Sequence, residues 1–127
     1  MRLAPSAATR QGRLDQLRRD RAAAPVLRDA FPTVQQLRIE LKFDGASSSG
    51  LTPQSHVLYP PARAFFEYSC PYSDCDGHID LGAAVATALA ATTHRAAGVL
   101  MCPGSRGAVH ASRRPCLLQV GYEVAYL

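Results

Sequence analysis

The clearest pattern in the chain is an alternation of apolar and charged side chains over residues 37–43. Its apolar positions are Leu37, Ile39, Leu41 and Phe43, and its charged positions are Arg38, Glu40 and Lys42. Successive side chains of a strand point to opposite faces, so a period of two predicts a strand with one buried and one solvated face. Residues 116–126 repeat the pattern, with one face made of Leu118, Val120, Tyr122, Val124 and Tyr126. We therefore expect two long strands in a sheet that buries one side.

Shorter apolar stretches predict three further strands, over residues 56–59, 64–70 and 98–102. A different spacing, that of one helical face, relates Leu81, Val85, Ala88 and Leu89. It predicts a helix over residues 81–93, with Asp80 as the N-cap. Residues 103–115 are rich in Gly, Ser and Arg and are expected to form a loop. The expected fold class is α+β: an antiparallel sheet of about four strands packed against one main helix.

Composition and charge divide the chain into a basic N-terminal segment and a neutral remainder. The 127 residues suit one domain, and a hydrophobic fraction of 47% excludes disorder over the full length. The net charge of +4 lies within residues 1–24, where six arginines stand against two aspartates; the remainder carries eight basic and eight acidic residues. We expect residues 1–24 to be an Arg-rich arm, helical or disordered, and residues 25–127 to be a single domain. Such an arm suits a nucleic acid or an acidic protein partner, because clustered cations meet their charges.

Four cysteines carry the candidate chemistry: Cys70, Cys75, Cys102 and Cys116. Their spacing is C-x4-C, then 26 residues, then C-x13-C. Three stand at predicted strand ends and one in a turn, so two distant segments would each present two thiols. Four thiolates in a tetrahedron form a closed structural Zn²⁺ site. No apolar stretch near the N-terminus marks a secretory signal, and we expect a cytoplasmic compartment, where metal ligation is favoured over disulfides.

The residues beside the cysteines repeat a short sequence. Proline follows both Cys70 and Cys102, and glycine stands two residues after Cys75 and after Cys102, as Gly77 and Gly104. A glycine with positive φ at these positions could turn its N–H toward the sulfur. With these motifs, residues 64–126 resemble zinc-ribbon proteins, although neither pair has the C-x2-C spacing usual in that family. The resemblance implies one structural Zn²⁺ held by two cysteine pairs, with no open position for metal catalysis.

Other arrangements of the thiols stay open: buried cysteines without metal, a disulfide pair or an Fe–S cluster. His78 is a candidate fourth ligand or a hydrogen-bond donor to a sulfur, and its simpler interpretation is a polar strand residue. The remaining histidines, expected on the solvated surface, are His56, His94 and His110. No catalytic residue is assigned. Asp74 and Asp76 flank Cys75, and neighbouring carboxylates raise the pKa of a thiol and so argue against a reactive thiolate.

Three functional interpretations follow from these residues. The first is a binding module, whose candidate contacts to anions or nucleic acid are Arg18, Arg19, Arg21, Arg106, Arg113 and Arg114. Strand aromatics such as Tyr68 could stack on bases, although such residues more simply form a core. The second is a redox or metal sensor, or an enzyme, that uses the same thiols. The third is a protein-assembly module without metal. No apolar run approaches the roughly 18 residues of a spanning helix, so no membrane partner is expected.

Overall fold

The computed structural model describes residues 10–44, 51–107 and 113–127. The helices of these residues are α1 (Arg10–Ala23), α2 (Leu27–Ala30) and α3 (Gly82–Ala90). The strands are β1 (Leu37–Asp44), β2 (Gln54–Leu58), β3 (Glu67–Ser69), β4 (His78–Asp80), β5 (Arg95–Met101), β6 (Ser105–Arg106), β7 (Arg114–Pro115) and β8 (Gln119–Tyr126). The expected fold class is confirmed: the protein is α+β and contains a four-stranded antiparallel sheet.

The main sheet has the strand order β2-β1-β8-β5. The two long strands that alternation predicts are its centre, and Ile39 of β1 stands opposite Val124 of β8. Both side chains are fully buried, whereas Arg38 and Glu40 between the buried positions of β1 are exposed. The alternation thus marks the buried face correctly.

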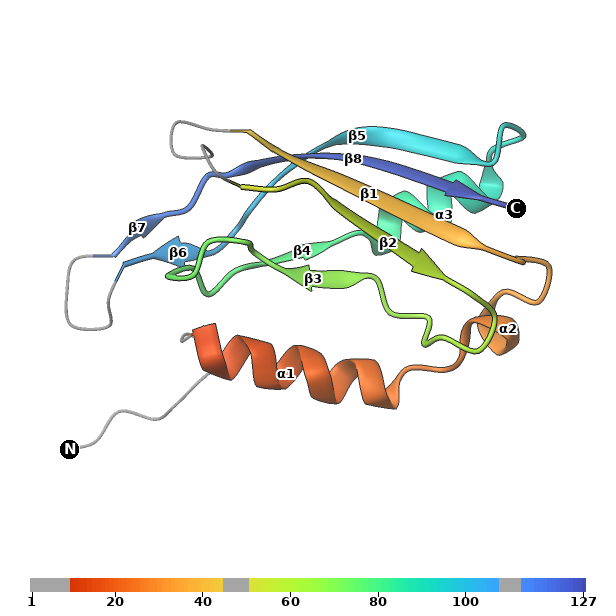
Figure 1. Ribbon diagram of the computed structural model, residues 1–127, viewed down its shortest axis with the longest axis horizontal. Helices are drawn as coiled ribbons and strands as arrows, with labels where there is room; N and C mark the ends of the chain where they lie inside the picture. Colours follow the sequence, from red (N-terminus) through yellow and green to blue (C-terminus); the bar gives the residue numbers. More distant parts are fainter. Residues whose placement is uncertain (1–9, 45–50, 108–112) are drawn as a thin grey trace.

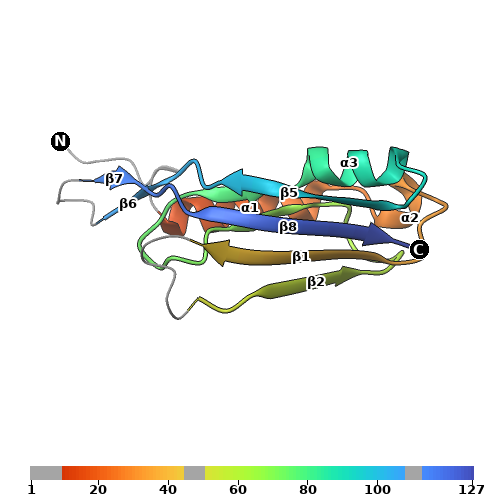
Figure 2. The ribbon, with the colours of Figure 1, turned by 90° about the horizontal axis from the view of Figure 1, so that it is seen from above.

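Helices α1 and α3 and the β3–β4 hairpin lie on the buried side of the sheet. Figure 1 shows the sheet uppermost, the β3–β4 hairpin below it and α1 at the bottom, and in Figure 2 the sheet lies in front of these elements. Helix α3 packs against β5 and β8, and α1 packs against β3. Val85 and Ala88 of α3 and Ile79 of β4 meet the apolar face of the sheet in one core cluster. The sheet therefore supports the hairpin that carries the first two cysteines.

The strand expected over residues 64–70 and the loop expected over residues 103–115 were both wrong in part. The strand expected over residues 64–70 covers only β3, because the N–H of Ala64 bonds to Pro25 instead of to a neighbouring strand. Residues 103–115 contain a second hairpin, β6–β7, whose two-residue strands are too short to show any alternation. The segment 108–112 between them lies outside the described residues.

The predicted main helix is shorter than expected. It ends at Ala90, before the β-branched pair Thr92 and Thr93, rather than at residue 93. Its N-cap position is Leu81, whose side chain makes no capping bond. Asp80 ends β4 instead. Its Oδ1 still accepts the Gly82 N–H at 2.8 Å, and so pairs one of the backbone N–H groups that have no partner within the first turn of the helix.

Residues 10–23 of the Arg-rich segment form α1, which lies along the rest of the fold. Leu17 is buried in this contact. The Arg21 guanidinium lies over the Phe65 ring, 5.0 Å from its centroid. A single buried leucine is a thin apolar contact, so polar bonds to the domain must hold much of this helix. Among the described residues, no helix has the length and apolar character needed to cross a membrane.

Candidate metal centre

The four cysteine sulfurs come together at one point between the two hairpins. All four Sγ atoms lie within 4.8 Å of one another. The Cys70 and Cys116 sulfurs are 3.8 Å apart, and the Cys75 and Cys102 sulfurs are 3.7 Å apart. A tetrahedron with metal–sulfur bonds of about 2.3 Å has edges of about 3.8 Å. The cluster therefore has the dimensions of a closed tetrahedral metal site, and its sulfurs are too far apart for disulfide bonds, which need about 2.05 Å.

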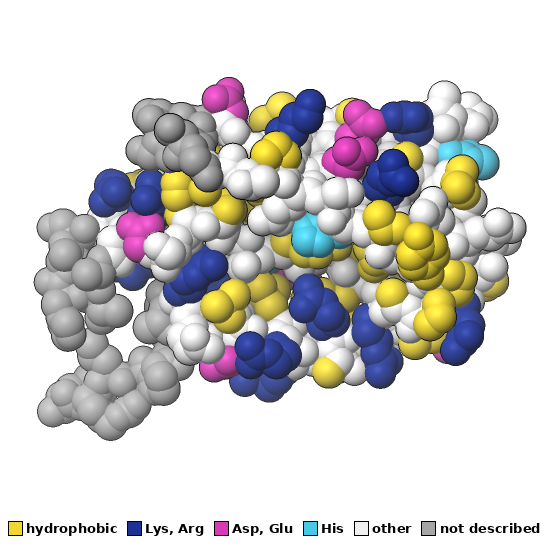
Figure 3. Space-filling view, in the orientation of Figure 1, with side chains coloured by type: hydrophobic (Ala, Val, Ile, Leu, Met, Phe, Trp, Pro, Cys, Tyr) yellow, Lys and Arg dark blue, Asp and Glu magenta, His cyan; other side chains and the backbone are white. Residues whose placement is uncertain are grey.

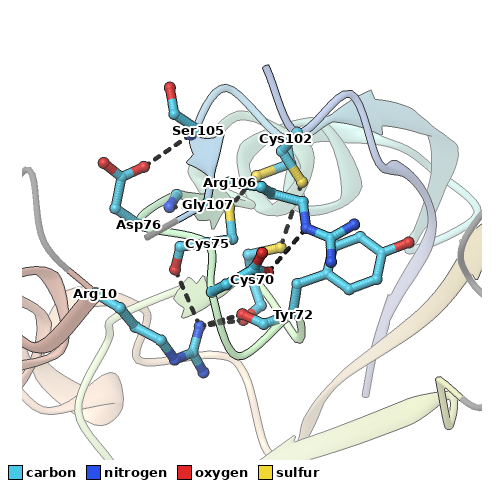
Figure 4. A network of polar contacts seen from close by, with 12 residues as sticks. Arg10, Cys70, Tyr72, Cys75, Asp76, Cys102, Ser105, Arg106 and Gly107 are labelled. Atoms are coloured by element: carbon cyan, nitrogen blue, oxygen red, sulfur yellow. Dashed lines mark hydrogen bonds and ion pairs between the residues drawn. The ribbon is translucent and has the colours of Figure 1, made fainter. Parts of the chain in front are cut away.

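Each hairpin supplies two of the thiols. Cys70 follows β3 and Cys75 lies in the turn before β4, whereas Cys102 and Cys116 flank the β6–β7 hairpin. Three of the side chains are buried, and Cys116 is half-buried. In Figure 4 the sulfurs of three of them, Cys70, Cys75 and Cys102, are seen to gather. Two segments that are distant in sequence thus converge on one buried point, as the spacing predicts.

The two halves of the site are built alike. The Cys70 N–H donates to the Gly77 carbonyl at 3.1 Å, and the Cys116 N–H donates to the Gly104 carbonyl at 2.9 Å. The Gly77 N–H points at the Cys75 Sγ at 3.3 Å, and the Gly104 N–H points at the Cys102 Sγ at 3.4 Å. Hydrogen bonds to a sulfur favour its thiolate form, which is the metal-binding form.

The reason for the two glycines differs from the one that the sequence suggests. Neither Gly77 nor Gly104 has positive φ. Instead, their backbones touch: a Cβ on Gly77 would stand 2.8 Å from the Gly104 Cα and 2.5 Å from the Cys102 Sγ. A Cβ on Gly104 would stand 2.4 Å from the Gly77 Cα. Glycine is needed because the two turns pack backbone against backbone, not because either adopts a left-handed conformation.

Without a cation, the crowded thiols resist ionisation together. Hydrogen bonding from the Cys70 thiol lowers the pKa of Cys102 to about 5, and the same bond raises the pKa of Cys70 itself. Burial raises the pKa of Cys75 to about 12. The thiolate of Cys102 is thus favoured, whereas Cys70 and Cys75 stay protonated. A bound metal ion would remove this conflict, because its charge stabilises all the thiolates at once.

Ion pairs join the two hairpins around the sulfurs. Arg106 of β6 bonds to Asp74 at 2.9 Å and lies over the Tyr72 ring at 3.6 Å. Asp76 pairs with Arg113 at 3.1 Å and also accepts the Ser105 N–H at 2.8 Å. The carboxylates beside Cys75 are therefore matched by arginines, so they do not act on the thiol as isolated negative charges.

The arginine candidates for anion contact fall into two groups. Arg106 and Arg113 are engaged in those ion pairs, and Arg114 lies exposed in β7. The other three lie on α1, where Arg18 pairs with Asp15, Arg19 donates to Gln16 and Arg21 donates to the Glu67 carbonyl. The structure thus does not gather the six into one patch.

Two further arginines belong to the site, although the sequence gives no sign of it. The Arg10 Nη1 donates to the carbonyls of Cys70, Tyr72 and Cys75 at 2.8, 2.7 and 3.2 Å, as Figure 4 shows. The Arg13 Nε donates to the Asp76 carbonyl at 3.2 Å. Helix α1 therefore fastens the turn that carries the first cysteine pair. No local pattern could reveal a contact that spans some sixty residues of chain.

We expect Arg10→Gln to weaken metal binding by roughly tenfold, because groups that hold the ligand loop in place affect metal affinity on that scale. The three carbonyls would lose their common donor, and the turn would hold its sulfurs less firmly. Competition against a chromophoric chelator measures the change. Arg19→Gln removes the same charge from an exposed position of the same helix and should leave the affinity unchanged; equal losses in both variants would contradict the positioning role.

The histidines take other places. His78 lies in β4, and its Nε2 stands 3.1 Å from the Glu67 Oε1, so a carboxylate and not a sulfur is its partner. Among the described residues, the group of side chains placed to hold a metal consists of the four cysteines and does not include His78. His56 was expected to be solvated, which is wrong: it lies half-buried in β2, stacked on Tyr68 at 4.0 Å. His94 stacks on Tyr126, and His110 lies outside the described residues.

Comparisons of the chain with protein-family models, with curated proteins and with solved structures find no significant match. The likeness to zinc ribbons therefore rests on the cysteine cluster and on the two hairpins that carry it.

Proposed function

We propose that the four cysteines hold one Zn²⁺ as a structural site, and that the protein is a cytoplasmic binding module for an anionic partner. The observation that carries the first part is the set of four sulfurs within 4.8 Å, two pairs of which have tetrahedral edge lengths. Four thiolates that close a tetrahedron suit Zn²⁺. The buried position of three of them favours a structural role over reversible chemistry.

The same geometry argues against metal catalysis. A catalytic zinc keeps one position open for water or substrate, whereas four protein sulfurs fill every position. The metal would instead join the β3–β4 hairpin to the β6–β7 hairpin. A small domain gains much of its stability from such a metal. The role of the metal would therefore be to hold the fold together, and the function would lie in a protein surface that recognises a partner. Helix α1 presents the largest group of arginines, and this favours a nucleic acid or an acidic protein as that partner.

The test is the metal content of the protein purified without added metal. We expect one zinc per chain and four thiols that resist a thiol reagent until a chelator removes the metal. Chelation should also broaden or abolish the cooperative unfolding transition, because binding free energy is folding free energy at such sites. Four freely reactive thiols in the purified protein would contradict a closed site. One iron per chain would support the four-cysteine metal site but would show that its metal is iron and not zinc.

A further inference from the structure

A basic groove runs between α1, strand β2 and the segment of residues 62–69. It consists of two hollows of about 410 Å³ each, which share Arg21, His56 and Tyr68 in their walls. Both hollows are open to solvent rather than enclosed. Figure 3 looks onto this side of the molecule, where dark blue side chains follow the line of α1. None of the four cysteines lines either hollow.

The described walls of the groove carry positive charge only. They include Arg18, Arg21 and Arg63 and no acidic side chain. Arg18 is paired with Asp15 of the same helix, so the uncompensated charges of the walls are those of Arg21 and Arg63. Within the described part of the chain, Arg21 and Arg63 are bound to the backbone carbonyls of Glu67 and Ala24, not to carboxylates. These bonds hold the two guanidinium groups in place without neutralising them. A guanidinium has five donors and matches the oxygens of a phosphate.

Flat rings stand beside these charges. The His56 ring stacks on Tyr68 with an interplanar angle of 16°, and the Arg21 guanidinium covers Phe65. Burial, and then the charge of Arg21, lower the pKa of His56, so its ring is neutral at pH 7. An acidic peptide would use the arginines but would gain little from the rings. A nucleotide uses both, because its base stacks and its phosphate pairs with arginine.

Resting on the proposed function, we propose that this groove binds single-stranded nucleic acid, with a base against His56 and phosphates on Arg21 and Arg63. An open trough lets a polymer pass along it, whereas a small ligand is usually enclosed on most sides. Arginine charges next to stacking rings are the combination that binds single strands without reading their sequence. Duplex bases are already stacked on each other and cannot reach the ring.

The groove also depends on the metal centre. Helix α1 forms one wall, and Arg10 and Arg13 fasten this helix to the turn that carries Cys70 and Cys75. If a bound metal were removed, this turn would lose the restraint that its two thiolate bonds supply, and α1 would lose a fixed turn to bind to. Chelation should therefore lower the affinity for a single strand even though none of the four cysteines lines the groove.

The experiment is fluorescence anisotropy with a labelled oligo(dT) of about twelve nucleotides, a length within the site sizes of single-strand binding domains. With two phosphate contacts, on Arg21 and Arg63, we expect the affinity to fall roughly sevenfold between about 50 and 200 mM salt. Arg21→Gln and His56→Ala should each weaken binding roughly five- to tenfold, through one lost phosphate contact and one lost stacking contact. Arg38→Gln, at an exposed position of β1 outside the groove, should change it less than twofold. Metal content and thermal unfolding of each variant show that the fold is intact.

Each outcome decides the proposal. Equal losses in Arg21→Gln and Arg38→Gln, with none in His56→Ala, would overturn it and leave binding by overall charge. Competition by poly-glutamate as strong as that by unlabelled oligo(dT) would overturn it in favour of an acidic protein partner. No binding of either polymer by folded, metal-loaded protein would overturn both the groove and the anionic partner of the proposed function. The absence of metal from a protein that still binds oligo(dT) through the groove would remove only the metal centre.

Discussion

Replacing Cys102 with serine is expected to abolish metal binding and to lower the free energy of unfolding by about 4 kcal/mol or more, since loss of a structural metal is among the largest single-residue effects. Cys102 is buried, and its sulfur stands 3.7 Å from that of Cys75. A serine hydroxyl does not ionise at neutral pH, so it cannot replace the thiolate. The measurements are metal content and chemical denaturation, with the same denaturant for wild type and variant.

A neighbouring residue provides the matched control. Met101 precedes Cys102, and its side chain is 51% exposed. Met101→Ser removes a sulfur one residue away from the site and should keep one metal per chain and nearly the full stability. A Cys102→Ser protein that unfolds at the same denaturant concentration as Met101→Ser would contradict a metal-dependent fold.

Adding one methyl group at Gly77 should be almost as damaging as losing a ligand. The new Cβ would stand 2.5 Å from the Cys102 Sγ and 2.8 Å from the Gly104 Cα. Backbone cannot move aside as a flexible side chain can, so the two turns must separate. We expect Gly77→Ala to cost about 3 kcal/mol of stability, the upper range for overpacking, and to weaken metal binding as the sulfurs move apart.

Gly121 is the control for this substitution. It lies in β8, and the nearest atom to an added Cβ is the Lys42 carbonyl oxygen at 3.9 Å, an ordinary contact. Gly121→Ala should therefore leave metal content and stability within about 0.5 kcal/mol of wild type, as is usual for a substitution without a clash. Should both alanine variants hold metal with wild-type affinity, the contact between Gly77 and Gly104 would not be required for the site.

Local pattern was a good guide to the large strands and a poor one to the short ones. The alternation over residues 37–43 predicts both the strand and its buried face, because side-chain direction in a strand follows from backbone geometry alone. Strands β6 and β7 have two residues each, too few to show a period, so the hairpin between Cys102 and Cys116 looks like a loop. Only the partner strand reveals it.

The Arg-rich segment is a second case in which the sequence does not reveal a tertiary contact. Its composition indicates a basic arm, yet Arg10 and Arg13 of α1 are bound to the cysteine-bearing turn. Charge counts say how many cations a segment carries, but not which carbonyls accept them. His56 and Tyr68 illustrate the point again: the sequence places them in two separate strands, and only the fold stacks them beside Arg21.

By itself, the sequence determined the fold class, the buried faces of the central strands and the four thiols as the centre of the chemistry. These features follow from periodicity and residue type, which act over a few neighbouring positions. The tertiary structure alone decided that Gly77 meets Gly104, that Arg10 fastens the cysteine turn and that a basic groove opens beside α1. Each of these joins residues far apart in the chain, and their distance is set only when the sheet, the hairpins and the helix pack together.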